Sequence, residues 1–543
     1  MPAPVAAARD PVDADVVLAY HARTKHRLAR YAAGPETLDW DAQPNPFREF
    51  AGCTRTKLPL TADRWARSLA EIYQPAGTPA PLTMESVAAL LELSMGLSAW
   101  KEYGPDRWAL RCNPSSGNLH PTEAYLVASG VAGLADGVYH YASHDHLLER
   151  RCRADFPFPC LMVGFSSVYW REAWKYGERA YRYCQHDVGH ALGALRYAAA
   201  VLGWRVRLLD DWGDEAVAAL LGLDRSGDFA AAETEAPDLL CLIEIEPEET
   251  TELPVVEAWV DAARSSEWVG LANALSGRHQ HDWPVIEEVH EAASKPPTES
   301  AGWRPPPTAP LPRIVCEHSA AALIKQRRSA QAFDGVTSIP AKTLFRLLDA
   351  TLPRANAPPF DLWRWPPRVH LLLFVHRVEG MSPGLYLFCR REGIHSEFRE
   401  VFRADFAWDT VAGCPEHLAF YRLVRANAQE AAKALSCHQE IAGDGAFSLG
   451  MLAELDAALA EGPWVYRRLF WECGLIGQAL YLEAEAAGVR GTGIGCFFDD
   501  PVHELLSLES TRFQSLYHFT IGGALVDQRL QTLPAYGHLG ERS

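Results

Sequence analysis

The chain has 543 residues, of which 48% are hydrophobic and 22% charged, so it is globular and long enough for two or more domains. Its formal net charge of -18 argues against sequence-independent nucleic-acid binding, which needs a basic face to neutralise phosphates. The apolar runs, such as His370 to His376, are strand-sized and far shorter than the roughly 20 residues of a membrane span.

The N-terminal sequence lacks the charged leader and apolar core of a secretory signal. The twelve cysteines are scattered without a C-x-x-C pair, which indicates reduced thiols rather than disulfides or a zinc site. These features predict a cytoplasmic protein without a metal, a nucleic-acid partner or a membrane association.

In chain order, the first half begins with the polar segment "ARTKH" at residues 22–26. A helix is expected after Thr83, a loop at "RCNPSSGNLHPTEAYLV" (residues 111–127), and a strand at "GVYHY" from Gly137. A long Ala/Leu-rich helix follows from Arg182, ends at Gly203 and leads into a short strand.

A proline-rich segment then divides the chain. Residues 294–313 contain seven prolines, a composition that favours an extended spacer. We therefore expect a first domain at residues 1–293, a linker at residues 294–313 and a second domain at residues 314–543.

The second half repeats the pattern of the first. "RRSAQ" from Arg327 parallels "ARTKH", a second helix is expected after Pro340, and "GLYLF" from Gly384 parallels "GVYHY". A second long helix runs from Arg467 to Gly488 and again leads into a strand. The repeat predicts an α+β fold of two similar domains, each with a mixed or antiparallel sheet and long helices, packed as an intramolecular pseudo-dimer. Two independent domains on a linker are the alternative.

Three segments could bind a ligand. "NPSSGN" offers hydroxyls, an amide and a glycine where backbone can approach a ligand, although an ordinary turn would have the same composition. "RRSAQ" offers two guanidiniums and a hydroxyl for a phosphate, or simply a solvated face. "GVRGTGIGCFFDD" exposes backbone N–H groups at its glycines, or forms a tight helix-to-strand connection.

Histidines at an i, i+4 spacing, His186 and His190, could bind a metal, but the sequence shows no third ligand. Packing inside the long helix is the preferred interpretation.

Together and in this order, these segments resemble the FMN-dependent nitroreductase family, specifically its SagB-type dehydrogenase branch in a tandem form. The resemblance implies that FMN is the cofactor and that two interlocking domains share the flavin site. It also implies a catalytic lysine–tyrosine pair, which matches Lys175 and Tyr176 in "WREAWKYGERAYRYC". The cofactor-binding residues that it implies are Arg111, Pro114, Ser115, Ser116, Asn118, Arg327, Arg328, Ser329, Gln331, Gly493, Ile494, Gly495, Cys496 and Arg529.

The motifs are divided between the halves. The Pro-Ser-Ser loop lies in the first half, whereas the phosphate segment, the glycines and Arg529 lie in the second. This division predicts one composite FMN site between the halves and a reciprocal site that has lost its parts.

The resemblance leaves the reaction open. A SagB-type enzyme would oxidise a peptide azoline beside a cyclodehydratase partner, with Lys175 and Tyr176 moving protons; a role in packing or capping is the alternative for this pair. An NAD(P)H-dependent reductase of nitro compounds or quinones is a second possibility. A third is a non-catalytic FMN-sequestering protein, with the bulky segment His395 to Leu449 as a lid.

Overall fold

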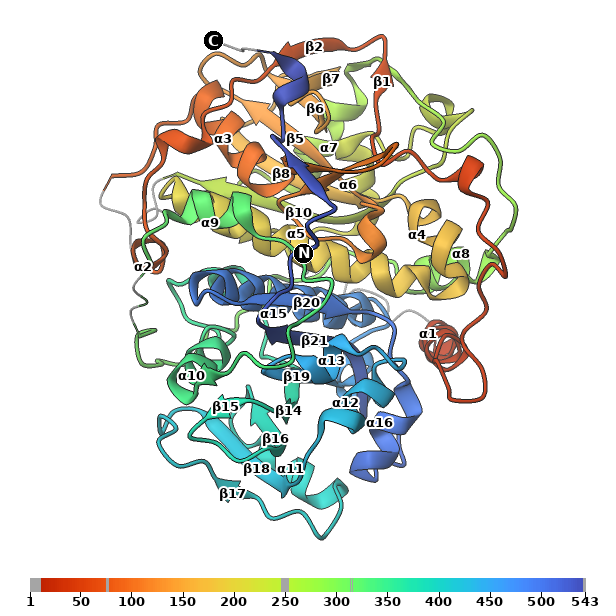
Figure 1. Ribbon diagram of the computed structural model, residues 1–543. Helices are drawn as coiled ribbons and strands as arrows, with labels where there is room; N and C mark the ends of the chain where they lie inside the picture. Colours follow the sequence, from red (N-terminus) through yellow and green to blue (C-terminus); the bar gives the residue numbers. More distant parts are fainter. Residues whose placement is uncertain (1–10, 75–77, 246–252, 313, 315, 541–543) are drawn as a thin grey trace.

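The computed structural model describes residues 11–540 except 75–77, 246–252, 313 and 315. The N-terminal segment in which we looked for a secretory leader therefore lies partly outside the described residues. Figure 1 shows two layered α+β halves, one above the other, with the long helices α5 and α15 between them.

The first half contains an antiparallel sheet of eight strands. Its order is β11 (Glu267–Trp268), β7 (Leu147–Arg153), β6 (Gly137–Ala142), β5 (Thr122–Ser129), β8 (Cys160–Ser167), β10 (Ala236–Glu244) and β9 (Arg205–Leu208), with β2 (Thr54–Lys57) also paired to β7. Its helices are α1 (Pro11–Arg23), α2 (Leu69–Ile72), α3 (Met84–Ser94), α4 (Tyr169–Tyr176), α5 (Ala180–Val201), α6 (Asp214–Leu221), α7 (Val256–Arg264) and α8 (Pro284–Ala292).

The second half contains a seven-stranded antiparallel sheet of the same central order. The order is β17 (Asp409–Thr410), β18 (Ala419–Arg425), β16 (Gly384–Cys389), β14 (Val369–Val375), β19 (Phe447–Glu454), β21 (Phe513–Gly522) and β20 (Arg490–Ile494). Its helices are α9 (Ala320–Gln326), α10 (Ala341–Asp349), α11 (Ile394–Val401), α12 (Gln429–Leu435), α13 (Ile441–Asp444), α14 (Leu455–Leu459), α15 (Val465–Ala486) and α16 (Asp499–Leu506).

These elements confirm the predicted α+β class. The two expected long helices are α5 and α15, and each ends before a glycine with positive φ, Gly203 at 78° and Gly488 at 75°. The predicted strands β6 and β16 are buried at every residue rather than at alternate ones, because helices or neighbouring segments cover both faces of each sheet.

Helices α5 and α15 cross at very short range. A Cβ atom on Gly189 would lie 2.3 Å from the carbonyl oxygen of Trp471, and one on Gly474 would lie 2.4 Å from that of His186. Glycine at both positions lets the two backbones touch. The main hydrophobic core continues through this crossing, from Leu195 on α5 to Leu475 on α15.

The ends of the chain cross between the halves. Helix α1 packs on the second half, where His21 Nδ1 and Tyr466 Oη are 3.1 Å apart. In return, β22 (Gln531–Leu533) pairs with β3 (Leu97–Tyr103) of the first half, next to β4 (Asp106–Arg111). The dark blue C-terminal segment in Figure 1 follows this path, so the halves interlock at both ends.

The shorter ladders are β1 (Phe50–Ala51) with β12 (Leu271–Ala272), and β13 (Ile339–Pro340) in parallel with β15 (Val378–Glu379). Residues 294–312 contain neither helix nor strand and contact both halves: Thr298 N donates to Asp211 O at 3.0 Å in the first half, and Arg354 Nε of the second half donates to Ala309 O at 3.0 Å. The expected domain limits at 293 and 314 stay a prediction.

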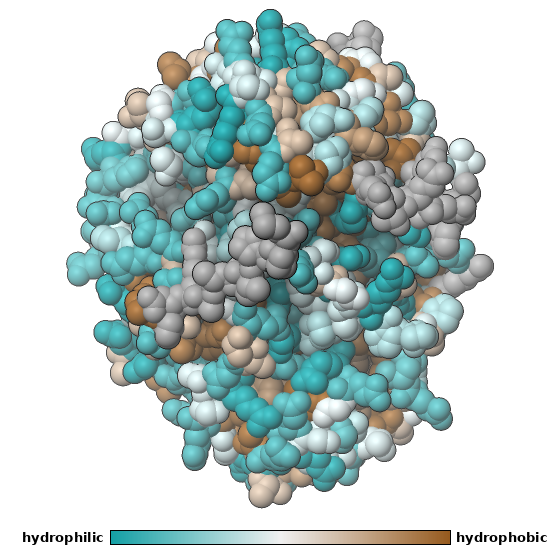
Figure 2. Space-filling model, turned by 180° about the vertical axis from the view of Figure 1, so that it is seen from behind, coloured by the Kyte–Doolittle hydropathy of each residue, from teal (hydrophilic) through white to brown (hydrophobic). Residues whose placement is uncertain are grey.

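The segment His395 to Leu449, which we considered as a lid, belongs to the body of the second half. Phe398, Phe402 and Phe406 are buried in a cluster against the second sheet. The face shown in Figure 2 is largely hydrophilic, with hydrophobic residues scattered over it. Among the described residues, none of the helices is both long and apolar enough to cross a membrane.

Candidate functional site

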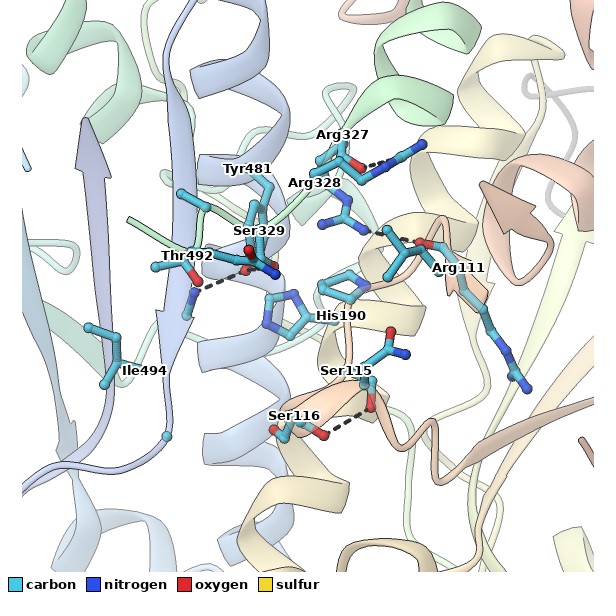
Figure 3. Close-up of a pocket in the computed structure, with 18 of the residues that line it drawn as sticks. Arg111, Ser115, Ser116, His190, Arg327, Arg328, Ser329, Tyr481, Thr492 and Ile494 are labelled. Atoms are coloured by element: carbon cyan, nitrogen blue, oxygen red, sulfur yellow. Dashed lines mark hydrogen bonds between the residues drawn. The ribbon is translucent and has the colours of Figure 1, made fainter. Parts of the chain in front are cut away.

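A cavity of about 420 Å³ lies at the junction of the two halves, a volume typical of small-molecule sites. One wall is the loop between β4 and β5 of the first half. The facing wall comes from the second half: the segment after α9, strand β20 and the residues that follow it. Figure 3 shows Ser115 and Ser116 pointing into the cavity from one side and Ser329 and Thr492 from the other.

The loop of the first wall is held from behind by a buried carboxylate. Asp187 on α5 accepts hydrogen bonds from Ser116 N at 3.1 Å and Ser116 Oγ at 3.2 Å. Gly117 and Asn118 both take a φ of 60°, a left-handed conformation that glycine and asparagine tolerate best. The Asn118 side chain donates to Ala109 O at 2.8 Å, so it shapes the loop.

Burial raises the pKa of Asp187 to about 7, against the opposing effect of hydrogen bonds from Ser115 and Ser116. This carboxyl therefore titrates near neutral pH, directly behind the loop. Burial also raises the pKa of Glu172, one helical turn before Tyr176.

The second wall presents the basic segment. Arg327 is buried, donates to Arg111 O at 3.1 Å, and has an Nε atom without a partner. The guanidinium of Arg328 is anchored to the first half, at 3.0 Å from Ser98 O. Ser329 Oγ lies 2.7 Å from Tyr481 Oη on α15.

Two further cations, Lys101 and Arg490, line the same end of the cavity. Burial and the positive charges of Arg328 and Arg490 lower the pKa of Lys101. Glu485 is the carboxylate of this cluster and lies 3.2 Å from Arg490 Nε. The excess of positive charge suits an anionic group such as a phosphate.

Glycine is required at positions 493 and 495, at the end of β20 and directly after it, because tyrosine side chains lie against both positions. A Cβ atom on Gly493 would lie 1.9 Å from Tyr517 Oη, and one on Gly495 would lie 2.2 Å from the ring of Tyr183. The N–H of Gly493 donates to Tyr481 Oη at 2.9 Å. That N–H is therefore used within the protein, contrary to our expectation that the glycines leave their N–H groups to a ligand.

Lys175 and Tyr176 end helix α4 beside the loop of the first wall. A Cβ atom on Gly117 would lie 2.6 Å from Tyr176 Oη and 3.1 Å from Lys175 Nζ. Tyr176 lines the cavity, and the Lys175 ammonium lies 5.3 Å from the centre of the Tyr176 ring. Both tips therefore approach the same point of the loop.

The structure brings most of the predicted residues into this one cavity. Those that line it are Arg111, Pro114, Ser115, Ser116, Asn118, Tyr176, Arg327, Arg328, Ser329, Gln331, Gly493, Ile494, Gly495 and Cys496.

Two arginines differ from the expectation. The Arg111 guanidinium donates to Pro46 O and points away from the cavity in Figure 3. At the cavity, the backbone carbonyl of Arg111 accepts a hydrogen bond from Arg327. Arg529 is not brought to the cavity: its side chain is 72% exposed and pairs with Asp527 at 2.7 Å. The short, solvated connection between β21 and β22 leaves that side chain free to turn outward, whereas Asp527 and Leu530 line the cavity.

Several lining residues were missed. Helix α5 contributes Tyr183, Asp187 and His190, which are four and three residues apart and so share one helix face. This spacing could have predicted from the sequence that they line one site together. His190 Nε2 lies 3.1 Å from Tyr517 Oη, and burial lowers the pKa of His190 to about 3. Tyr481 and Tyr517 are far away in sequence, and nothing in their local sequence distinguishes them.

The reciprocal position between the halves, next to β9 of the first half, has a smaller cavity of about 190 Å³. It is lined by the indoles of Trp365, Trp464 and Trp471, and Lys295 of the proline-rich segment reaches it. Lys295 Nζ donates to Trp212 O at 3.0 Å. The two sites have therefore diverged in size and in lining.

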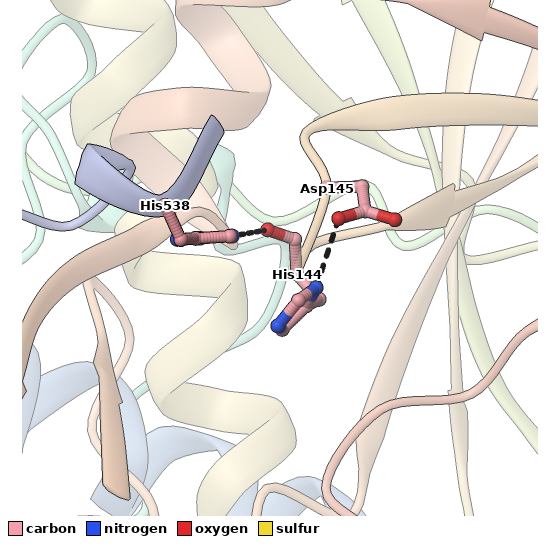
Figure 4. A group of neighbouring side chains, drawn as sticks. All are labelled: His144, Asp145 and His538. Carbon is pink, nitrogen blue, oxygen red and sulfur yellow. Dashed lines mark hydrogen bonds and ion pairs between the residues drawn. The ribbon is translucent and has the colours of Figure 1, made fainter. Parts of the chain in front are cut away.

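A separate group of potential metal ligands lies near the C-terminal end (Figure 4). It consists of His144, Asp145 and His538. His144 Nδ1 and Asp145 Oδ1 are 2.9 Å apart, and His538 Nε2 donates to His144 O at 3.0 Å. These contacts fasten the C-terminal segment onto the first half.

The fold and the cavity define an α+β protein of two interlocked halves with a cavity between them that is lined by basic and aromatic residues. Residues 324–523 match the model of the Nitroreductase family, so this part of the chain is a nitroreductase-family domain.

The chain is also similar to a solved structure from Anabaena variabilis, a provisionally assigned nitroreductase. The identity is 24% and the TM-score 0.66, over 94% of this chain and 99% of the other. At this identity the likeness shows the fold alone.

Two curated relatives were found by sequence. Trifolitoxin-processing protein TfxB of Rhizobium leguminosarum bv. trifolii is 28% identical over 194 residues, 31% of this chain and 52% of that protein. A provisionally assigned nitroreductase of Methanocaldococcus jannaschii, MJ1384, is 26% identical over 137 residues, 23% of this chain and 66% of that protein. The chain thus spans less than two thirds of each relative's length.

Proposed function

We propose that the chain is an FMN-dependent oxidoreductase with one flavin site, located in the cavity between its halves. The observation that carries the proposal is the division of the lining: Ser115 and Ser116 come from the first half, and Arg327 and Ser329 from the second. Neither half has a complete set of these groups.

The chain's residues fit the phosphate end of FMN. Arg327 is 4% exposed and has an unpartnered Nε atom, an arrangement that is costly unless an acceptor binds there. The Ser329 hydroxyl and the nearby Arg490 add further donors. Charge-assisted hydrogen bonds of this kind are the strong ones in phosphate recognition.

The cavity also fits a flat ring. Tyr183, Tyr517 and His190 supply aromatic surface from α5 and β21, and Ile494 adds an apolar contact. When bound, FMN would supply the hydride acceptor and donor, at its N5 atom. The protein would orient it and limit access of water.

Within this class we propose a SagB-type dehydrogenase that oxidises a peptide azoline or a related substrate, made by a cyclodehydratase partner. Lys175 and Tyr176 meet the loop at Gly117, where a proton could pass to or from a substrate. Burial raises the pKa of Glu172, which interacts with Lys175, so its protonated carboxyl could supply a proton to this pair. The name of one relative, a toxin-processing protein, agrees with an action on a modified product.

A second candidate is an NAD(P)H-dependent reductase of nitro compounds or quinones. The nitroreductase-family domain at residues 324–523 favours it. The two candidates differ in whether Lys175 and Tyr176 are needed.

The test uses Lys175→Met and Tyr176→Phe in the full chain loaded with FMN. Bound FMN and the oxidation of a thiazoline-containing peptide are measured together, with Lys342→Met and Tyr386→Phe as controls in the second half. We expect normal flavin content in all four variants and a loss of about 100-fold or more in oxidation for the first two, as for a missing acid–base group.

Wild-type oxidation by both Lys175→Met and Tyr176→Phe would reject the dehydrogenase. Fast anaerobic bleaching of the flavin by NADPH, followed by reduction of a nitroaromatic, would favour the reductase. A flavin that neither substrate changes would indicate an FMN-sequestering protein.

A further inference from the structure

Two thiols meet at one end of the cavity. Cys496 follows β20 and lines the cavity, and Cys437 lies in the turn between α12 and α13. Their Sγ atoms are 2.8 Å apart although the residues are 59 positions apart in sequence. Both side chains are half-buried, so small molecules can reach them. Gln439 Nε2 donates to Cys496 O at 3.1 Å and holds the two segments together.

The surroundings of the pair distinguish the two sulfurs. The hydrogen bond with Cys437, together with His26 and the positive charge of Arg179, lowers the pKa of Cys496 to about 5. The same hydrogen bond and burial raise the pKa of Cys437. At neutral pH the pair therefore consists of one thiolate and one thiol.

His26 is placed to favour the thiolate. Its Nδ1 accepts a hydrogen bond from Ala32 N at 2.9 Å, so the proton of the neutral imidazole lies on Nε2. Burial lowers the pKa of His26, which keeps the ring neutral, and its side chain hydrogen-bonds with Cys496. The segment "ARTKH" thus supports Cys496, which lines the cavity.

Other cysteines lack these features. Burial raises the pKa of Cys53 and Cys112 to about 11 and that of Cys241 further. Thiols of this kind are slow to react because little thiolate is present.

We propose that Cys437 and Cys496 are a redox-active dithiol–disulfide pair that reacts with low-molecular-weight disulfides. Cys496 is the attacking sulfur and Cys437 the resolving one. The inference rests on the contact of the two sulfurs, on the partial exposure of both and on the position of Cys496 in the cavity wall, and it does not depend on the proposed flavin chemistry.

The reaction proceeds in two balanced steps. The Cys496 thiolate attacks one sulfur of R–S–S–R, forming Cys496–S–S–R and releasing one R–S⁻. Cys437 then loses its proton to solvent, and its sulfur attacks Cys496, forming the intramolecular disulfide and releasing the second R–S⁻. The protein loses two electrons, and the small disulfide gains them as two thiols.

The test equilibrates the full chain with reduced and oxidised glutathione in varying ratio, traps free thiols with iodoacetamide and maps linked peptides by mass spectrometry. We expect a Cys437–Cys496 linkage that dithiothreitol reverses. Cys437→Ser should leave Cys496 as a stable mixed disulfide with glutathione, and Cys496→Ser should leave Cys437 unmodified. Cys53→Ser, at another half-buried thiol, should not change the linkage.

Two results would overturn the proposal. One is the absence of peptides joined by a Cys437–Cys496 disulfide even under strongly oxidising conditions. These are ratios of oxidised to reduced glutathione that would convert dithiothreitol, used as a reference, to its disulfide. The other is alkylation of Cys496 no faster than that of Cys53 at about pH 6, since the pKa is lowered to about 5 for Cys496 and raised to about 11 for Cys53.

Discussion

The hydroxyl of Tyr481 joins the two segments of the second half that line the cavity. It lies 2.7 Å from Ser329 Oγ and 2.9 Å from Gly493 N, and the side chain is 2% exposed. Tyr481→Phe removes one oxygen atom and leaves both groups without this partner. We expect weaker FMN binding, because the bound state needs Ser329 and β20 in place, whereas the free protein can let them relax toward water.

An unmade buried hydrogen bond costs about 1–3 kcal/mol, and part of this cost is shared with the free protein. We therefore expect Tyr481→Phe to weaken the free energy of FMN binding by about 1–2 kcal/mol, which raises the Kd of FMN about 5- to 30-fold. The Kd is measured from the quenching of FMN fluorescence as the protein is titrated into FMN.

The matched control is Tyr386→Phe. Tyr386 is also 2% exposed, and its hydroxyl donates to Ser382 O at 2.7 Å, away from the cavity. The Tyr386→Phe variant should lose a similar free energy of unfolding, whereas its Kd for FMN should not change. An unchanged Kd for Tyr481→Phe, or an equal change in both variants, would refute the reasoning.

Two more predictions concern the crossing of α5 and α15 and the carboxyl behind the loop. Gly474→Ala puts a Cβ atom 2.4 Å from His186 O, and overpacking of this kind costs about 1–3 kcal/mol, so Tm should fall by several degrees. The control is Gly277→Ala, whose added Cβ atom meets nothing within 4 Å and should leave Tm unchanged. Equal Tm values for the two variants would contradict the close contact of α5 and α15. The pKa of Asp187 is raised from 3.8 to about 7 in the folded chain, so its stabilising effect is complete below about pH 4 and is lost as the pH rises through 7. The stability of Asp187→Asn relative to the wild type should therefore increase between about pH 4 and about pH 7, by up to about 4 kcal/mol in total, and a Tm difference independent of pH would reject the shift.

The sequence predicted the elements whose patterns are local. Thr83 caps α3, and Gly203 and Gly488 terminate the long helices, because these conformations depend on the residue itself. The loop at Ser115 and the basic segment at Arg327 stood out as local patterns, but their expected role in a flavin site came from the resemblance to the nitroreductase family.

The rest depends on distant contacts. Tyr481 and Tyr517 reach the cavity only because α15 and β21 pack beside β20, and Cys437 meets Cys496 only through the turn between α12 and α13. The orientations of Arg111 and Arg529 also depend on their neighbours, Pro46 and Asp527. No spacing in the sequence encodes these approaches.

The number of FMN molecules bound per chain tests the composite site most directly. It can be measured by titrating the flavin-free full chain with FMN and confirmed from the flavin released on denaturation. We predict one FMN per chain, with binding weakened by Ser115→Ala from one half and by Arg327→Ala from the other. Two FMN per chain, none, or a loss of binding from changes in one half alone would contradict a single site built by both halves.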